Sequence, residues 1–170
     1  MLRHIQERVS HSVTTEWISS LKTTKSNTQQ NERIYIEKLK SILTDCGCTF
    51  QQAGSQQSKD FRNIQHADFE GSLNIEAKMT KGMNIMANDT LPSEDTFYIV
   101  FFTGNKTFKP QFFWKQGNEF TSNNGWEKEY LNEIATIKKK YCTKSNGKRE
   151  GQMSCYVRPN WSICIKDFLV

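Results

Sequence analysis

The stretch Ser72-Leu-Asn-Ile-Glu-Ala-Lys-Met-Thr80 alternates polar and apolar side chains along its whole length. Successive side chains of a β-strand point to opposite faces of a sheet, so this alternation predicts a strand over residues 72–80. Its apolar face carries Leu73, Ile75, Ala77 and Met79. Its polar face carries Asn74, Glu76, Lys78 and Thr80. The Glu76 carboxylate and the Lys78 amine are therefore expected to be neighbours on one surface.

Outward from this strand, hydrophobic periodicity and turn residues predict the other elements. Residues 96–103 form a continuous apolar run, which is typical of a strand covered on both faces. Residues 60–69 alternate loosely, and Glu70-Gly71 is the predicted turn that joins them to residues 72–80. The remaining predictions are helices over residues 1–22, 31–45 and 126–141, with Asn31 as an N-cap, and strands over residues 48–53, 108–115, 154–157 and 162–165. This order of elements predicts an α/β fold around one mixed sheet.

The polar residues 22–30 have no hydrophobic period and are expected to be a linker. They divide the chain into an N-terminal helical arm, residues 1–25, and a main domain, residues 31–170. Such an arm can pack against a second subunit as a dimerisation element, or it can dock on its own core. The sequence leaves both arrangements open.

The chain has 170 residues and a formal net charge of +5. This length suits one ordinary domain. The positive charge attracts polyanions such as nucleic acids, although many enzymes of small anions share such a mild excess. No stretch approaches the apolar length of a membrane span, and the chain does not open with a signal-peptide pattern. We therefore expect a cytoplasmic protein that does not bind a membrane.

Asp60 and Glu76 are the acids whose placement points to chemistry. Asp60 begins the strand that precedes residues 72–80, so a hairpin can bring its carboxylate beside Glu76. Two carboxylates about 4 Å apart repel by roughly 4 kcal/mol at an effective dielectric near 20. A cation would offset that repulsion, and Mg²⁺ suits one or two carboxylates, water and a substrate phosphate. Lys78 beside them could orient or deprotonate an attacking water, or stabilise charge on the phosphate.

The runs Ser58-Lys-Asp60 and Leu73-Asn-Ile-Glu76-Ala-Lys78 resemble the signature of the PD-(D/E)xK nuclease superfamily. Lys59 stands where the signature has a proline. The resemblance covers roughly residues 31–141 and extends to the order of a helix, an Asp-bearing strand, an ExK strand and a later helix. It implies a restriction-endonuclease-like α/β/α core, with a central mixed sheet flanked by helices.

The segment after the ExK strand narrows the resemblance. The runs Lys81-Gly82, Asn88-Asp-Thr-Leu-Pro92 and Phe97-Tyr-Ile-Val-Phe-Phe102 resemble the corresponding part of small type II restriction endonucleases. This resemblance implies a homodimer, of prokaryotic or phage origin, that cuts double-stranded DNA at a short palindrome.

The resemblance also implies roles for individual residues. Asp60 and Glu76 would be Mg²⁺ ligands, with the Ala77 carbonyl as a third, and Lys78 would be the catalytic lysine. Two further acids are weaker candidates. Glu32 lies on the expected inward face of a helix, where an acid in the first turn also suits the helix dipole. Asp68 competes with Asp60, but it lies close to the predicted turn.

Polar and basic residues of the loops and of the last predicted helix are the candidates for DNA binding. The basic ones can neutralise phosphates, and the amides can hydrogen-bond to bases. Cations at the end of a helix also complement its dipole, which is the alternative explanation for the lysine cluster. The candidates are Lys81, Asn84, Asn88, Lys138, Lys139, Lys140, Lys144, Lys148 and Arg149.

Three other interpretations stay open. A four-way-junction resolvase of the same superfamily also resembles this chain in its Asp, Glu-Ala-Lys and following Thr-Lys, and it would recognise DNA shape. A non-catalytic nucleic-acid-binding domain would be unaffected by replacement of Glu76 or Lys78. Cys46 and Cys48 could bind zinc with distant partners, although reduced, small apolar side chains explain them more simply.

Overall fold

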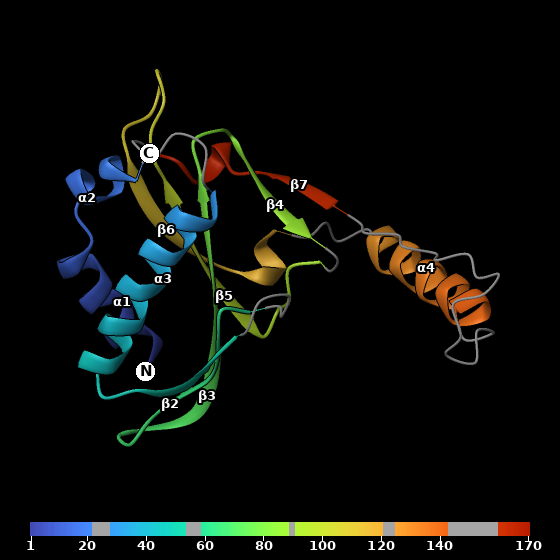
Figure 1. Ribbon diagram of the computed structural model, residues 1–170, viewed down its shortest axis with the longest axis horizontal. Coiled ribbons are helices and arrows are strands. Elements are labelled where there is room, and N and C mark those ends of the chain that lie inside the picture. The colour runs from blue at the N-terminus through green and yellow to red at the C-terminus, as the bar shows by residue number, and fades with distance from the viewer. Residues whose placement is uncertain (22–27, 54–58, 89–90, 121–124, 143–159) are drawn as a thin grey trace.

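The computed structural model describes residues 1–21, 28–53, 59–88, 91–120, 125–142 and 160–170 (Figure 1). Its elements in chain order are α1 (Leu2–Ser12), α2 (Thr15–Ser20), α3 (Thr28–Asp45), β1 (Thr49–Gln52), β2 (Phe61–His66), β3 (Phe69–Thr80), β4 (Asn84–Asn88), β5 (Thr96–Phe102), β6 (Gln111–Gln116), η1 (Gly117–Glu119), α4 (Trp126–Cys142), β7 (Asn160–Cys164) and η3 (Lys166–Phe168).

The central sheet is mixed and has five strands in the order β1-β2-β3-β5-β6. β3 and β5 are parallel, whereas the other neighbouring pairs are antiparallel. β5 is buried along its length, and its alternate side chains enter two separate hydrophobic clusters. The predictions of a mixed α/β fold and of a strand covered on both faces are therefore confirmed.

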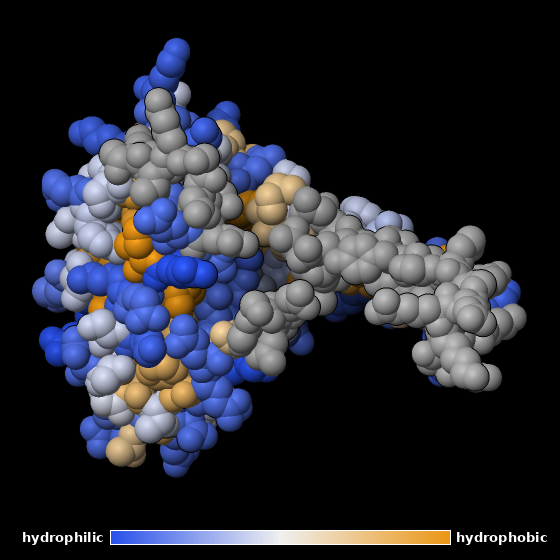
Figure 2. All heavy atoms as spheres, viewed as in Figure 1, coloured by the Kyte–Doolittle hydropathy of each residue, from blue (hydrophilic) through white to orange (hydrophobic). Residues whose placement is uncertain are grey.

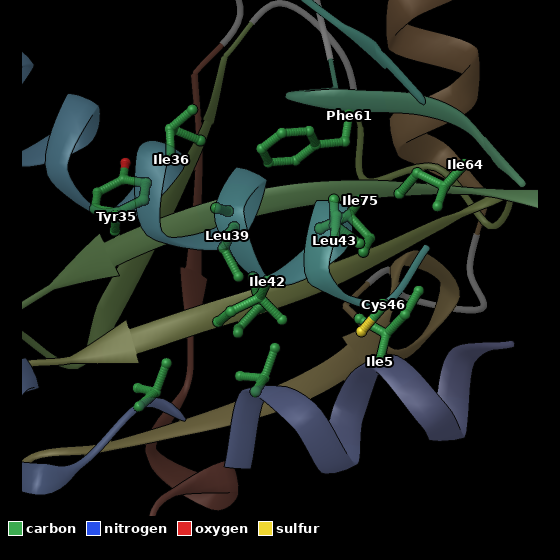
Figure 3. Packing of buried hydrophobic residues seen from close by; sticks show 14 of the residues in the cluster. Ile5, Tyr35, Ile36, Leu39, Ile42, Leu43, Cys46, Phe61, Ile64 and Ile75 are labelled. Carbon is green, nitrogen blue, oxygen red and sulfur yellow. The ribbon is translucent and has the colours of Figure 1, made fainter. Parts of the chain in front are cut away.

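Helices α1, α2 and α3 cover one face of this sheet (Figure 1). Figure 3 shows Leu39 and Leu43 of α3 beside Ile75 of β3 and Phe61 of β2, with Ile5 of α1 on the other side of α3. Burial of such aliphatic side chains contributes about 1.5–3 kcal/mol each, so this interface is a major part of the core. The N-terminal arm thus packs on its own core.

The opposite face of the sheet is covered by the two-stranded sheet of β4 and β7 and by the C-terminal segment. The buried residues of this second cluster are Ile85, Val100, Phe102, Ile165 and Leu169. α4 projects away from the central sheet instead of covering it (Figure 1). In the part of the chain that the structure describes, α-helices therefore flank only one face of the sheet, and the expected α/β/α arrangement is not observed there.

Three local predictions differ from the structure. The helix expected over residues 1–22 is broken near Val13, because the Thr14 hydroxyl accepts a hydrogen bond from Trp17 N and so caps a new helix, α2. α3 begins three residues before Asn31, which is buried inside the helix and is not its N-cap. The hairpin turn is at residues 67–68, whereas Glu70-Gly71 lies within β3.

The final strand is observed as β7, whereas predicted residues 154–157 lie outside the described residues. Most of the described surface in Figure 2 is hydrophilic, with apolar side chains in narrow bands. No helix in the described ranges is long and apolar enough to cross a membrane.

Candidate active site

Asp60, Glu76 and Lys78 lie together at the end of the β2–β3 hairpin opposite its turn. The pairing of Phe61 with Ile75 brings Asp60 opposite Glu76. The Asp60 backbone N–H donates a 3.2 Å hydrogen bond to Glu76 Oε2. Lys78 Nζ donates a 2.6 Å hydrogen bond to Glu76 Oε1. The site thus has two carboxylates and one amine on adjacent strands.

The alternation of β3 determines which way these side chains point. Leu73, Ile75 and Ala77 are buried in the cluster beneath the helices, whereas Glu76 and Lys78 belong to the other face. Their side chains remain partly accessible, at 15% for Glu76 and 26% for Lys78. Both side chains are therefore in contact with solvent.

The Asp60 carboxylate is fixed by the backbone of β3. Asp60 directly precedes β2, and its Oδ2 accepts a 2.7 Å hydrogen bond from the Ala77 N–H. The N–H and C=O groups of one strand residue point to the same side. The Ala77 carbonyl is therefore directed toward the Asp60 side of β3.

Burial and the neighbouring acid together change the protonation of Asp60. Burial raises the pKa of the Asp60 carboxyl to about 7, and the Glu76 charge is the second cause. The hydrogen bond from Ala77 and the charge of Lys78 act in the opposite direction. Near neutral pH the carboxyl is therefore poised between its two forms, and a bound cation would favour the ionised form.

Two tyrosines beside this site were not recognised in the sequence. Tyr35 comes from α3, and Tyr98 of β5 is the pairing partner of Glu76. Burial and, after it, the neighbouring acidic charges raise the pKa of Tyr35. Burial is also the main cause that raises the pKa of Tyr98 to about 12. Both hydroxyls are therefore protonated at neutral pH. The pairing of β3 with β5 brings Tyr98 to the site, and the packing of α3 on the sheet brings Tyr35.

The two weaker acidic candidates, Glu32 and Asp68, lie at different places in the structure. Glu32 is exposed on α3, beyond the first helical turn, but its charge still contributes to the raised pKa of Asp60. Its expected inward orientation is therefore wrong. Asp68 lies at the opposite end of the hairpin, and its side chain is 82% exposed. The structure does not bring Asp68 to Glu76.

The donor atoms of this site fit Mg²⁺, which prefers carboxylate and carbonyl oxygens. Asp60 and Glu76 supply carboxylates, and the Ala77 carbonyl is directed toward the Asp60 side of β3. Across the described residues, no group of three or more His, Cys, Asp or Glu side chains could hold a metal ion. A Mg²⁺ site at this position would consist of these three residues, with water and substrate as further ligands.

The DNA-binding candidates are not gathered at one place. Lys81 is exposed just after β3, whereas the Asn84 side chain donates to Ser162 Oγ. Lys139 and Lys140 are exposed in the last turn of α4, on the helix that projects from the sheet (Figure 1). For Asn88 and Lys138 only the backbone positions, in β4 and α4, are described. Lys144, Lys148 and Arg149 lie outside the described residues.

Cys46 and Cys48 are buried in the cluster beneath the helices. Burial is the main cause that raises the pKa of each thiol. Both side chains are therefore protonated and pack as small apolar groups, which is the simpler of the two sequence interpretations.

Comparison of the chain with known protein families, with curated proteins and with solved structures finds no match, so only its own residues and their geometry point to a function.

Proposed function

We propose that this chain is a Mg²⁺-dependent endonuclease that hydrolyses phosphodiester bonds of double-stranded DNA. One observation carries the proposal. Asp60, directly before β2, meets Glu76 of β3, with the Asp60 backbone nitrogen 3.2 Å from Glu76 Oε2, while Lys78 Nζ lies 2.6 Å from Glu76 Oε1. Paired carboxylates beside an amine suit a hard cation and a phosphate group better than they suit a structural role.

The proposed roles follow from the atoms that each residue offers. Asp60, Glu76 and the Ala77 carbonyl would hold Mg²⁺, which supplies a water of lowered pKa and stabilises charge on the phosphate. The Lys78 amine lies beside Glu76 and is partly accessible. Its amine can orient the attacking water or contact a phosphate oxygen. Asp60 enters the ionised state most readily when positive charge is added to the site.

DNA as the substrate is supported by the net charge of +5 and by exposed Lys81 just after the ExK strand. The resemblance to small type II restriction endonucleases narrows the proposal to a homodimer that cuts at a specific palindrome. Two-fold symmetry of the protein would then match two-fold symmetry of the site.

The test is digestion of a supercoiled plasmid by the purified chain with Mg²⁺ or with EDTA. We expect discrete fragments with Mg²⁺ only. Glu76→Gln and Lys78→Met should each lower the cleavage rate by about 10²- to 10⁴-fold, the usual effect of losing a catalytic group. Lys115→Met is the matched control, because Lys115 also pairs with an acid, Glu119, and is 27% exposed. Full activity of Glu76→Gln would refute the proposal.

A second substrate separates the two nuclease interpretations. A synthetic four-way junction and a linear duplex of the same sequence are digested in parallel. Fragments from the duplex support a site-specific endonuclease, whereas cleavage of the junction alone would identify a resolvase. Binding of DNA without cleavage of either substrate would identify a non-catalytic domain.

A further inference from the structure

The backbone on both sides of Asp60 is in an unusual conformation. Lys59 has φ 72° and Asn63 has φ 49°, and these are the non-glycine residues with positive φ among those described. A side chain with a Cβ resists this left-handed region, which Asn and Asp adopt more readily than Lys does. Such strain persists only when surrounding contacts hold it, and it concentrates at functional sites. Lys59 is therefore the position that needs an explanation.

An ion pair holds the strained residue. Lys59 Nζ donates to both carboxylate oxygens of Asp95, at 2.8 and 2.6 Å. The same carboxylate accepts from the Ser93 hydroxyl and, at 2.9 Å, from Thr96 Oγ1. Asp95 directly precedes β5, so its carboxylate is fixed relative to the sheet. Lys59, which is 36 residues away in sequence, is thereby attached to the start of β5.

The side chain of Asn74, in β3, is hydrogen-bonded both to Asp95 and to the backbone of Asn63. Its Nδ2 donates to the Asp95 carbonyl at 3.1 Å and to Asp95 Oδ2 at 3.4 Å. Its Oδ1 accepts a 3.1 Å hydrogen bond from the Asn63 N–H. By the alternation of β3, Asn74 belongs to the face that carries Glu76. The hydrogen bonds of Lys59, Asp95 and Asn74 therefore extend across β2, β3 and β5, on the face of the sheet that carries the proposed active site.

We propose that the Lys59–Asp95 ion pair, supported by Asn74, is the positioning device that holds Asp60 against Glu76 and Ala77. Asp60 directly follows Lys59, and both of its contacts with β3 depend on the direction that the chain takes there. Its N–H must reach Glu76 Oε2, and its Oδ2 must reach the Ala77 N–H. Lys59 and Asp95 are positioning residues, and they act on substrate only through Asp60.

The inference rests on the proposed function for the chemistry of Asp60, but its test does not need cleavage. Hydrogen exchange of the Ala77 amide, followed by NMR, reports directly on the bond to Asp60 Oδ2. In Lys59→Met and in Asp95→Asn this amide should exchange about tenfold faster than in the wild type, the effect of losing one charge-assisted hydrogen bond. Amides of β5, such as Ile99, should keep their exchange rates.

Lys59→Arg is the rescue variant, because a guanidinium can also bind both oxygens of a carboxylate. It should restore slow exchange at Ala77. The Mg²⁺ dissociation constant, measured by calorimetry, should rise about tenfold in Lys59→Met and stay near the wild-type value in Lys59→Arg. Lys115→Met, which breaks the comparable ion pair with Glu119, should change neither quantity.

The outcomes separate this inference from the proposed function. Faster exchange at Ala77 in the Lys59 and Asp95 variants supports the positioning role even if the wild type cuts no DNA. Unchanged exchange in both variants would overturn it even if the wild type cuts DNA well. Loss of protection throughout β5 in both variants would also overturn it, because the pair would then stabilise the whole sheet.

Discussion

The backbone amide of Asp60 donates a hydrogen bond to Glu76 Oε2, 16 residues later in the chain. This bond joins the residue before β2 to the middle of β3, so the two acids are held together before any cation binds. Burial and, after it, the nearby Glu76 charge raise the pKa of Asp60, and the consequences can be measured.

Asp60→Asn should stabilise the metal-free fold at pH 8 and not at pH 4. The pKa of Asp60 is raised from 3.8 to about 7 in the fold, mainly by burial and then by Glu76. Between these values the folded protein keeps a proton that the unfolded chain loses, so stability falls as pH rises from about 4 to 7. Asn carries no charge, so we expect a gain on the order of 2–4 kcal/mol at pH 8. Urea unfolding measures it.

Asp68→Asn is the control for this experiment, since Asp68 is highly exposed at the hairpin turn. Its unfolding free energy should follow the wild type at both pH values. Identical pH dependence in Asp60→Asn and the wild type would contradict the raised pKa.

Mg²⁺ binding should weaken as pH falls below 7. A carboxylate must lose its proton to bind a cation. Burial, with a smaller contribution from the Glu76 charge, raises the pKa of Asp60 to about 7. Below that pH the dissociation constant should rise about tenfold per pH unit, and above it the affinity should level off. Calorimetry at pH 6, 7 and 8 measures the trend. An affinity that does not change over this range would mean that Asp60 is not a ligand.

The strands of the site could be predicted because their patterns are local. β3 buries Leu73, Ile75 and Ala77 because the strand period is two, and the sequence shows that period directly. The apolar run of residues 96–103 likewise predicts β5, because a strand buried on both faces can be recognised without knowing which strands lie beside it. The convergence of Asp60 with Glu76 required only a hairpin between two such strands.

The remaining features depend on contacts between distant residues. The Lys59–Asp95 pair joins residues 36 apart, and the sequence showed Lys59 only as a departure from the proline of the family signature. β4 pairs with β7, a partner whose position no local pattern gives. The amphipathic pattern of α4 predicts its helix but not its direction away from the sheet (Figure 1). Periodicity shows which face of an element is apolar, and not what covers it.

Gly117→Ala should destabilise the fold through Ser93. A Cβ at Gly117 would lie 2.0 Å from the Ser93 carbonyl oxygen, so the backbone there would have to move. Ser93 N donates a hydrogen bond to the Tyr98 hydroxyl, and we expect the displacement to break that bond as well. We expect a loss of about 1–3 kcal/mol, the usual cost of overpacking. Thermal unfolding measures it.

Gly82→Ala is the matched control for Gly117→Ala. The nearest atom to its added Cβ would be Thr80 Oγ1 at 3.8 Å, an ordinary van der Waals distance. Its stability should stay within about 0.5 kcal/mol of the wild type. Equal stability of the two variants would show that the Ser93 segment moves without cost.

Lys81→Ala should weaken DNA binding and reduce its dependence on salt. Lys81 is exposed just after β3, three residues beyond Lys78. We therefore expect it to contact the backbone of a DNA held at the proposed active site. Each phosphate that a protein cation neutralises contributes about −0.9 to the slope of log K against log salt concentration. Fluorescence anisotropy with a short duplex, in a Glu76→Gln background without cleavage, measures that slope between 50 and 200 mM salt, the range over which such contacts are lost. Lys106→Ala, in the exposed loop between β5 and β6, is the control and should leave the slope unchanged. An equal slope in the Lys81 variant and its parent would place DNA elsewhere on the molecule.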